Sequence, residues 1–367
     1  MTTTKVCFIS PSSYGYFTNN KKIAGGGAER QLYLLGNNLT DDFNVSFVVG
    51  DYGQASVESH ENISLYRAHR PDPEKNPVSK IFLLAKAMSK TDADLYITRG
   101  NPQLAAITFL ISRMVRSEWC FHVANDVDLT SRVNSLPLPV RYLFSYGIKN
   151  AKFIVVQTKR QHRLLTENFN RTGYLIPNGY NIPSDYDGMG TRNFYLWVGR
   201  LDAEQKRPHL YLEIAKELPE KKFVLIGSDD NDQKYSKLIK AKASKIPNLT
   251  YINGVAPDEI QSYYEGAIAL VNTSSYEGFP NTFLEAWRVK TPVISLDVDP
   301  SRFISIDKNF NSYAKGELTT LIRSLRAIDK GNQREIIGVQ SYNQFVNNYS
   351  INEISDLYAS AIRNHCC

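Results

Sequence analysis

The chain has 367 residues, of which 42% are hydrophobic and 22% charged, a composition typical of a globular protein whose length favours two domains. Its longest apolar run, residues 104–112, is far below the ~18 residues that a membrane-spanning helix needs. Residues 1–5 lead directly into an apolar, strand-like segment, which leaves no room for a signal peptide. We therefore expect a cytoplasmic protein.

The net charge of +6 is unevenly distributed along the chain. Residues 1–180 contain 21 Lys and Arg against 14 Asp and Glu, whereas the rest of the chain contains 22 against 23. A basic first half indicates an anionic partner, such as a phosphate-bearing lipid at the inner face of a membrane. The amphipathic segment 139–149 is a candidate for peripheral membrane contact, although core packing with a solvated face is the commoner use of such a helix. No nucleic-acid-binding module is recognisable.

Apolar runs alternate with helical periods through the first half of the chain. We predict strands over residues 5–10, 44–49, 95–98, 118–123, 153–157 and 174–176. Helices fit between these strands, beginning near Ala28, Val78, Pro102, Pro139 and Lys159. The turn signal Pro177-Asn178-Gly179 follows, and the polar segment 181–192 is typical of a linker.

The second half repeats the alternation. We predict strands over residues 194–198, 222–226, 249–252, 268–272 and 293–296, a helix over 281–290 and a last helix over 353–364. The simplest architecture is α/β, with two Rossmann-like, doubly wound domains. Residues 1–180 would form the first domain and residues 181–349 the second, with the C-terminal helix, about residues 350–367, packing back on the first.

The four cysteines show no metal-ligand spacing. Cys7 and Cys120 fall in predicted buried strands. Cys366 and Cys367 form an adjacent pair at the end of the chain, where a frayed tail is the simpler interpretation and lipidation the alternative.

Open α/β sheets bind ligands at the carboxyl ends of their strands, so the residues that follow each strand are the candidates for a site. Gly25-Gly26-Gly27 opens a helix and would let a ligand approach the backbone closely, although a flexible loop explains the run equally well. His122 ends an apolar run and could contact a sugar hydroxyl or a developing charge. An isolated histidine beside a strand is, however, more often structural.

In the second half, Gly199-Arg200 follows the first predicted strand, and Lys206 lies six residues beyond Arg200. Arginine offers a planar fork for phosphate oxygens, and lysine offers a mobile point charge. The pair could hold a diphosphate and offset its charge as it departs. Two ordinary surface cations are the alternative.

The segment from Glu277 to Glu285 carries the most information in the sequence. It joins a buried strand, a turn and a helix start, where backbone N–H groups without helical partners attract an anion such as phosphate. Glu277 in the turn could reach sugar hydroxyls, and Glu285 within the helix could accept hydrogen bonds from a ribose. Combined with Arg200 and Lys206, the segment predicts a nucleotide-sugar pocket.

At this point the chain resembles the retaining glycosyltransferases of family 4, which have the GT-B fold of two facing Rossmann-like domains. The resemblance covers nearly the whole chain, and its motifs are jointly specific in order and spacing. They are Gly25 to Glu29, His122, Ile176 to Gly179, Gly199-Arg200 with Lys206, and Glu277 to Glu285.

The resemblance implies roles for individual residues. It implies that Arg200 and Lys206 bind the diphosphate, that Glu285 binds the ribose and that Glu277 binds the donor sugar. It also implies a catalytic or sugar-orienting role for His122. The other donor-binding positions would be Gly26, Gly27, Gly199, Gly227, Val255, Gly278, Phe279, Pro280, Asn281 and Thr282, with the turn Val255-Ala256-Pro257 and Gly227 beside the nucleobase. Acceptor-binding candidates are Asn125, Asp126 and Arg99, the last only from its place at a strand end.

Two sequence features depart from the family pattern. Asp126-Val-Asp128 and Asp297-Val-Asp299 look like the metal-binding D-x-D of a different glycosyltransferase fold. We interpret both as unrelated to a metal, because the resemblance implies that the Arg/Lys pair neutralises the leaving group. No cofactor and no metal are therefore expected.

The expected function is transfer of a sugar from a nucleoside diphosphate sugar, most often a uridine diphosphate sugar, to a hydroxyl of a glycan or lipid-linked acceptor. This would serve polysaccharide or glycoconjugate biosynthesis, with the first domain binding the acceptor. A nucleotide-sugar 2-epimerase of the same fold is one alternative, although the six scattered histidines supply acid/base groups poorly. A non-catalytic protein that binds a sugar nucleotide is the other.

Overall fold

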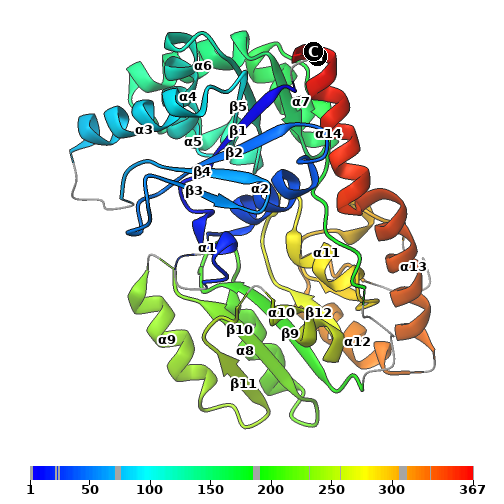
Figure 1. The fold of residues 1–367 in the computed structure, drawn as a ribbon. Coiled ribbons are helices and arrows are strands. Elements are labelled where there is room, and N and C mark those ends of the chain that lie inside the picture. Colours follow the sequence, from blue (N-terminus) through cyan, green and yellow to red (C-terminus); the bar gives the residue numbers. More distant parts are fainter. Residues whose placement is uncertain are drawn as a thin grey trace. The chain divides into compact units, whose positions relative to one another are not determined.

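The computed structural model describes residues 3–20, 23, 25–70, 76–184, 191–230, 232–256, 258–305, 312–330 and 332–366. The chain divides into two compact units. The first consists of Met1–Gly179 together with Ile351–Cys367, and the second of Tyr180–Ser350. Figure 1 shows the course of the chain through both units.

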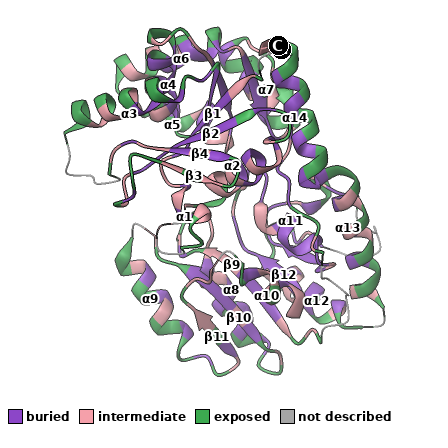
Figure 2. Cartoon of the chain, in the orientation of Figure 1, coloured by how far each residue is buried: buried purple, intermediate pink, exposed green. Residues whose placement is uncertain are grey.

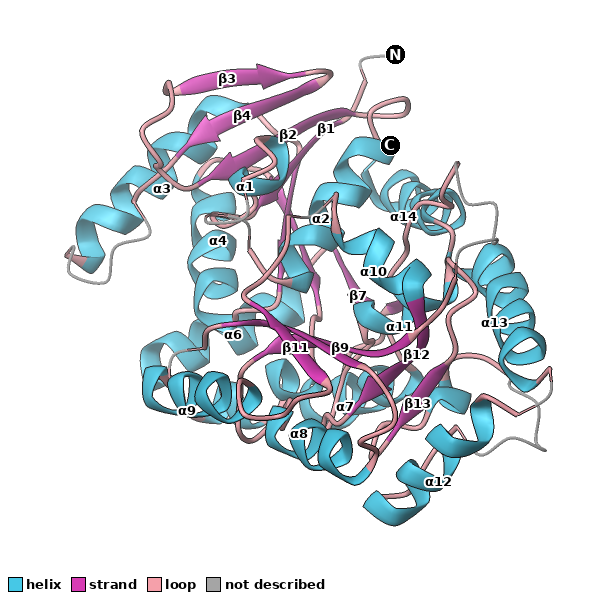
Figure 3. Cartoon of the chain, turned by 90° about the horizontal axis from the view of Figure 1, so that it is seen from below, coloured by secondary structure: helices cyan, strands magenta, loops and turns pink. Residues whose placement is uncertain are grey.

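The first unit is built on an eight-stranded sheet whose order is β3-β4-β2-β1-β5-β6-β7-β8. Its strands are β1 (Lys5–Ile9), β2 (Asn44–Val49), β3 (Val57–His60), β4 (Ile63–Arg67), β5 (Leu95–Arg99), β6 (Glu118–His122), β7 (Phe153–Val156) and β8 (Tyr174–Leu175). All neighbours are parallel except β3 and β4, which form an antiparallel ribbon at one edge (Figure 3). The sequence analysis missed this ribbon because β3 is short, polar and half-exposed.

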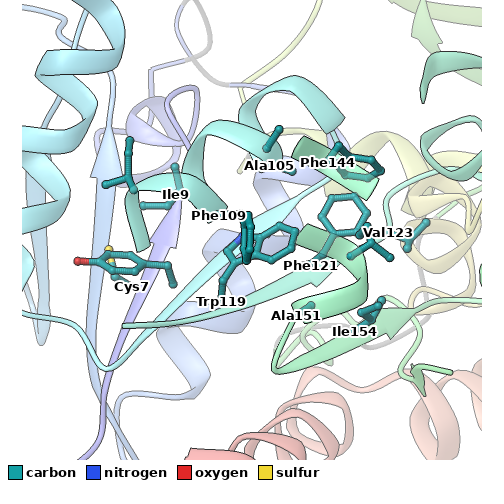
Figure 4. Close-up of a cluster of buried hydrophobic side chains, with 14 of the residues drawn as sticks. Cys7, Ile9, Ala105, Phe109, Trp119, Phe121, Val123, Phe144, Ala151 and Ile154 are labelled. Atoms are coloured by element: carbon teal, nitrogen blue, oxygen red, sulfur yellow. The ribbon is translucent and has the colours of Figure 1, made fainter. Parts of the chain in front are cut away.

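Helices cover both faces of this sheet. The unit contains α1 (Tyr14–Phe17), α2 (Gly27–Asn38), α3 (Pro77–Thr91), α4 (Pro102–Met114), α5 (Ser131–Asn134), α6 (Leu138–Asn150), α7 (Lys159–Phe169) and α14 (Ile351–Cys366). Buried side chains of α3, α4 and α6 pack on one face with Trp119 and Phe121 of β6 (Figure 4). Side chains of α2 and α14 pack on the other face with Phe8 and Phe47. Strand residues alternate between the two clusters because successive side chains of a strand point to opposite faces.

The last helix, α14, belongs to the first unit although it ends the chain. Ile354, Tyr358 and Ile362 of α14 join the cluster that α2 and the sheet form. Gly179, the last residue of the first segment, packs so closely that an added Cβ would lie 2.8 Å from Ile354 Cγ1. The backbone of Gly179 also forms two hydrogen bonds of 3.0 Å with the Gln31 side-chain amide, one as donor and one as acceptor.

The second unit has a five-stranded, fully parallel sheet of order β11-β10-β9-β12-β13. Its strands are β9 (Phe194–Arg200), β10 (Phe223–Ser228), β11 (Leu249–Ile252), β12 (Ala267–Asn272) and β13 (Val293–Ser295). Its helices are α8 (Pro208–Glu217), α9 (Gln233–Ala243), α10 (Ile260–Gly266), α11 (Asn281–Trp287), α12 (Leu318–Ile328) and α13 (Gln333–Tyr349). Strand β12 is wholly buried and β10 mostly so, whereas β9 is buried over residues 195–197 and becomes exposed at Arg200 (Figure 2). Both units are therefore Rossmann-like.

None of the helices in the described part of the chain is long and apolar enough to cross a membrane.

Cys7 and Cys120 are buried in β1 and β6, and burial raises the pKa of the Cys7 thiol to about 12. Cys366 ends α14, whereas Cys367 lies outside the described residues.

His122 occupies the core of the first unit. Its side chain is 2% exposed at the end of β6, and Nδ1 lies 3.5 Å from the hydroxyl of Tyr358 on α14. Burial, and secondly the charge of Arg99 on the neighbouring strand, hold the pKa of His122 well below 6.5. A neutral, enclosed imidazole of this kind has the surroundings of a structural residue. The catalytic or sugar-orienting role expected for His122 stays a prediction.

We predict that Ile362→Ala destabilises the first unit by about 2–5 kcal/mol, because Ile362 is fully buried and its removal leaves a cavity. Leu357→Ala, on the same helix but 49% exposed, is the matched control and should stay within about 0.5 kcal/mol. Hydrogen exchange of peptides from β1 and β7 measures the opening free energy. Equal effects of the two substitutions would contradict the packing of α14 described above.

His122 also predicts a pH dependence of stability. Because its pKa is depressed in the folded state, the unfolded chain takes up the proton first. The stabilisation is complete above pH 6.5 and declines as the pH falls through that value, by up to about 1.4 kcal/mol per pH unit. His122→Gln removes this dependence. The free energy of unfolding in urea should therefore fall more between pH 7.5 and pH 5.5 for the original protein than for the variant. Parallel pH profiles would contradict the prediction, because they would show that the pKa of His122 is the same in the folded and unfolded chains.

Candidate functional site

The carboxyl edge of the second sheet brings two loops together. The chain leaves β9 towards α8 and β10 on one side, and returns later to place β12 on the other side of β9. Neighbouring strands whose connections diverge in this way create the crevice where α/β sheets bind ligands. The loop after β9 (residues 201–207) and the loop after β12 (residues 273–280) both begin at this crevice.

Hydrogen bonds fasten the two loops to each other. The Ser275 N–H donates to the Gln205 carbonyl at 2.8 Å, and the Thr273 hydroxyl donates to the Lys206 carbonyl at 2.7 Å. Trp197 of β9 donates its indole N–H to the same Thr273 hydroxyl at 2.9 Å. The backbone that carries Lys206 is therefore fixed relative to the backbone that carries Glu277.

Lys206 and Glu277 form an ion pair across the two loops. Their side chains are 20% and 9% exposed, and the Gln205 side-chain amide lies 3.5 Å from the second Glu277 oxygen. Such a partly enclosed pair is less screened by solvent and salt than a surface pair. An ammonium group has three donors, so Lys206 can bind Glu277 and a ligand oxygen together.

Arg200 is placed differently from the expectation. Its guanidinium, which is 51% exposed, binds Asp230 after β10 at 2.9 Å and not a group beside Lys206. Each cation of the predicted Arg/Lys pair thus has its own carboxylate partner. The two lie at the ends of the same β9–α8 connection, but the structure does not join their side chains into one cluster.

Glu285 lies inside the second unit, 5% exposed on α11. Its carboxylate accepts hydrogen bonds from the hydroxyls of Tyr264 at 2.7 Å and Tyr180 at 3.0 Å. The expectation that Glu285 accepts hydrogen bonds from a ribose stays a prediction, since a carboxylate that two tyrosine hydroxyls reach can accept further hydrogen bonds. A ribose would have to share the carboxylate with them.

The turn between Glu277 and Glu285 is largely buried. Phe279 packs edge-on against Phe303 and also contacts Tyr349, so its side chain anchors the turn. Gly278 and Pro280 are buried beside it. Pro280 precedes α11, whose first residues Asn281 and Thr282 are partly exposed.

The remaining donor candidates lie at the ends of neighbouring strands. Gly199 and Gly227 are a register pair of β9 and β10. At Gly227 an added Cβ would lie 2.6 Å from Leu201 Cδ2, so this position excludes a side chain by packing. Val255 follows β11 at the edge of the sheet, and Pro257 lies outside the described residues.

The candidates in the first unit form a separate group. Gly26 caps α2 and Gly27 begins it, and the Tyr16 hydroxyl donates to the Gly25 carbonyl at 2.6 Å. Asn125 caps a short 3-10 helix, Asp126–Leu129, through its side chain, and Asp126 pairs with Arg160 at 2.8 Å.

Arg99 donates to the Asn178 side chain at 2.6 Å. This hydrogen bond helps to hold the chain before Gly179, and the acceptor-binding role of Arg99 stays a prediction.

The two D-x-D sequences also have structural partners. Buried Asp128 accepts from the Asn125 N–H at 2.8 Å and pairs with Arg132, and Asp297 pairs with Arg207. Asp299 caps the short 3-10 helix Pro300–Arg302. Over the described residues no group of three or more His, Cys, Asp or Glu side chains is arranged to hold a metal ion.

Sequence reasoning missed several residues that shape the site. Gln205, Asp230, Tyr180, Tyr264 and Arg207, the partner of Asp297, were not singled out. The signal for Asp230 was its position two residues after β10. The tyrosines gave none, because they approach Glu285 from other elements.

Comparison with known proteins gives this geometry a context. Residues 184–354 match the family described as "Glycosyl transferases group 1". A relative, the amylovoran biosynthesis glycosyltransferase AmsD of Erwinia amylovora, is 26% identical over 310 residues, covering 80% of this chain and 84% of that protein.

Solved structures resemble the whole chain. A sucrose-phosphate synthase of Thermosynechococcus elongatus has a TM-score of 0.77 at 16% identity, with 98% of both chains covered. The HepE protein of Anabaena, solved in complex with UDP and glucose, has a TM-score of 0.74 at 16% identity, with 98% of this chain and 99% of that chain covered. The expected fold is confirmed by these likenesses, and the family match covers most of the second unit and the first residues of α14. The chain is thus a glycosyltransferase enzyme with the GT-B fold.

Proposed function

We propose that the enzyme is a retaining glycosyltransferase of the family 4 type. It moves a sugar from a nucleoside diphosphate sugar, with a uridine diphosphate sugar favoured, to a hydroxyl of a glycan or lipid-linked acceptor. The observation that carries the proposal is the Lys206–Glu277 ion pair at the crevice between β9 and β12. The UDP and glucose bound to HepE support the choice of donor, and the function named for AmsD supports polysaccharide biosynthesis.

In this proposal the diphosphate lies against Lys206 and the start of α11. Lys206 Nζ keeps one donor on Glu277 and directs the others to phosphate oxygens. Arg200, being half-exposed, exchanges Asp230 for a phosphate oxygen. Glu277 orients the donor sugar through its hydroxyls, and Glu285 holds the ribose while Tyr180 and Tyr264 keep its carboxylate in place.

The reaction exchanges one bond at the anomeric carbon of the donor. The bond from that carbon to the phosphate oxygen breaks, and the acceptor oxygen bonds to it from the same face. The acceptor's proton passes to the departing phosphate oxygen, so no protein nucleophile is needed. Catalysis then depends on positioning and on positive charge held where the diphosphate develops negative charge.

The first unit would bind the acceptor. Its support is the position of Arg99 at the end of β5 and of Asn125 and Asp126 after the carboxyl end of the neighbouring strand β6. Parallel neighbours bring such ends to one edge of a sheet.

We predict that Lys206→Ala lowers the turnover number by about 100- to 1,000-fold, as loss of one charge-stabilising donor does in other enzymes. Lys216→Ala, at an exposed position of α8, is the matched control and should keep full activity. Transfer from a radiolabelled donor measures both, with circular dichroism as the check on folding. A folded Lys206→Ala protein of near-normal turnover would refute the assignment.

We further propose that transfer needs no divalent metal, since Lys206 and Arg200 can supply the positive charge. Initial rates with and without EDTA should then agree within about twofold, far less than the effect of removing a catalytic charge. A loss of activity in EDTA that Mg²⁺ or Mn²⁺ restores would show a metal requirement.

A further inference from the structure

Three neighbouring helices of the first unit present one continuous outer surface. Helices α3, α4 and α6 cover the same face of the sheet, and their buried residues belong to one core cluster. Helix α4 lies between the other two, in contact with both. Since the inner sides of all three face the sheet, their outer sides share one direction. Exposed positions run along each of them in Figure 2.

This surface, which we call the three-helix face, carries the most exposed large apolar side chains of the described chain. They are Val78 and Phe82 of α3, Met114 of α4, and Leu138, Tyr142 and Tyr146 of α6, and each is between 61% and 75% exposed. The next most exposed of the described large apolar residues, Leu357, reaches only 49%. Scattered single residues of this kind are ordinary, but a group on adjacent helices marks an interaction site.

The charges on the same helices are all of one sign. The three helices contain six cations, Lys80, Lys86, Lys90, Arg113, Arg141 and Lys149, and no Asp or Glu. The ion pairs between described residues involve none of the six. The cations therefore remain available to an anionic partner.

We infer that the three-helix face docks the enzyme on an anionic lipid bilayer. Apolar side chains flanked by lysine and arginine, with no acidic residue, are the features of a surface that lies in the interface of a membrane. Tyr142 and Tyr146 fit it because a tyrosine has an apolar ring and a polar tip. A second copy of the chain does not fit, since six cations would then face six cations.

This inference goes beyond the proposed transfer reaction and is tested without turnover. Binding is measured by flotation of the full-length protein with vesicles of phosphatidylcholine alone and with added phosphatidylglycerol. We expect binding to the anionic vesicles only, and weaker binding at high salt because salt screens the attraction. Absence of binding to phosphatidylglycerol vesicles would overturn the inference.

Two sets of charge reversals locate the surface. Each Lys or Arg near an anionic membrane strengthens binding about fivefold, so Arg113→Glu, Arg141→Glu and Lys149→Glu together should weaken it on the order of a hundredfold. Lys234→Glu, Lys237→Glu and Lys242→Glu on exposed positions of α9 change the net charge equally and should have an effect below about threefold. Equal loss in both proteins would show attraction by net charge alone and overturn the assignment to this face.

The apolar part has its own test. Phe82→Ser, Met114→Ser and Tyr142→Ser together keep every charge and should lower binding to anionic vesicles at least about tenfold, because these side chains enter the interface. Unchanged binding would overturn the insertion of the apolar residues. Thermal shift with a nucleoside diphosphate reports on the second unit in every variant, so failure of the docking surface and failure of the proposed donor site remain distinguishable.

Discussion

The return of the chain from β11 to β12, on the far side of β9, is the constraint on which the donor site depends. It places the loops after β9 and β12 beside each other, and Thr273 and Ser275 then bind the first loop to the second. Lys206 and Glu277 are 71 residues apart in the chain and meet only because of this strand order. A different order would leave both charges as ordinary loop residues.

The charged groups of the site are held in place by partners within the protein. Lys206 lies against Glu277, Arg200 against Asp230, and the Glu285 carboxylate between two tyrosine hydroxyls. A site arranged in this way has less conformational entropy to lose when a ligand binds. It also keeps opposite charges paired, which avoids the cost of an isolated charge in a partly buried crevice.

Much of the fold follows from local sequence pattern. The strands Asn44–Val49 and Leu249–Ile252 were predicted from apolar runs, and the helix starts at Pro102 and Lys159 from the helical periods between strands. The β3–β4 ribbon was not, because a half-exposed strand such as Val57–His60 lacks a clear apolar period.

Side-chain partners were less predictable than the elements that carry them. Arg200, Lys206 and Glu277 were predicted from their positions after strands. The sequence did not indicate that Arg200 forms an ion pair with Asp230. The position of His122 at a strand end was predicted, but not that Tyr358, 236 residues later, lies 3.5 Å from its ring. Such pairings depend on contacts between distant elements, which the sequence analysis could not establish.

The most direct test of the account is hydrogen exchange of the full chain with and without saturating UDP. If the crevice between β9 and β12 binds the diphosphate, UDP should slow exchange in peptides covering residues 200–207 and 273–285, and Lys206→Ala should abolish that protection. Binding of UDP without protection of these two segments would contradict the central claim.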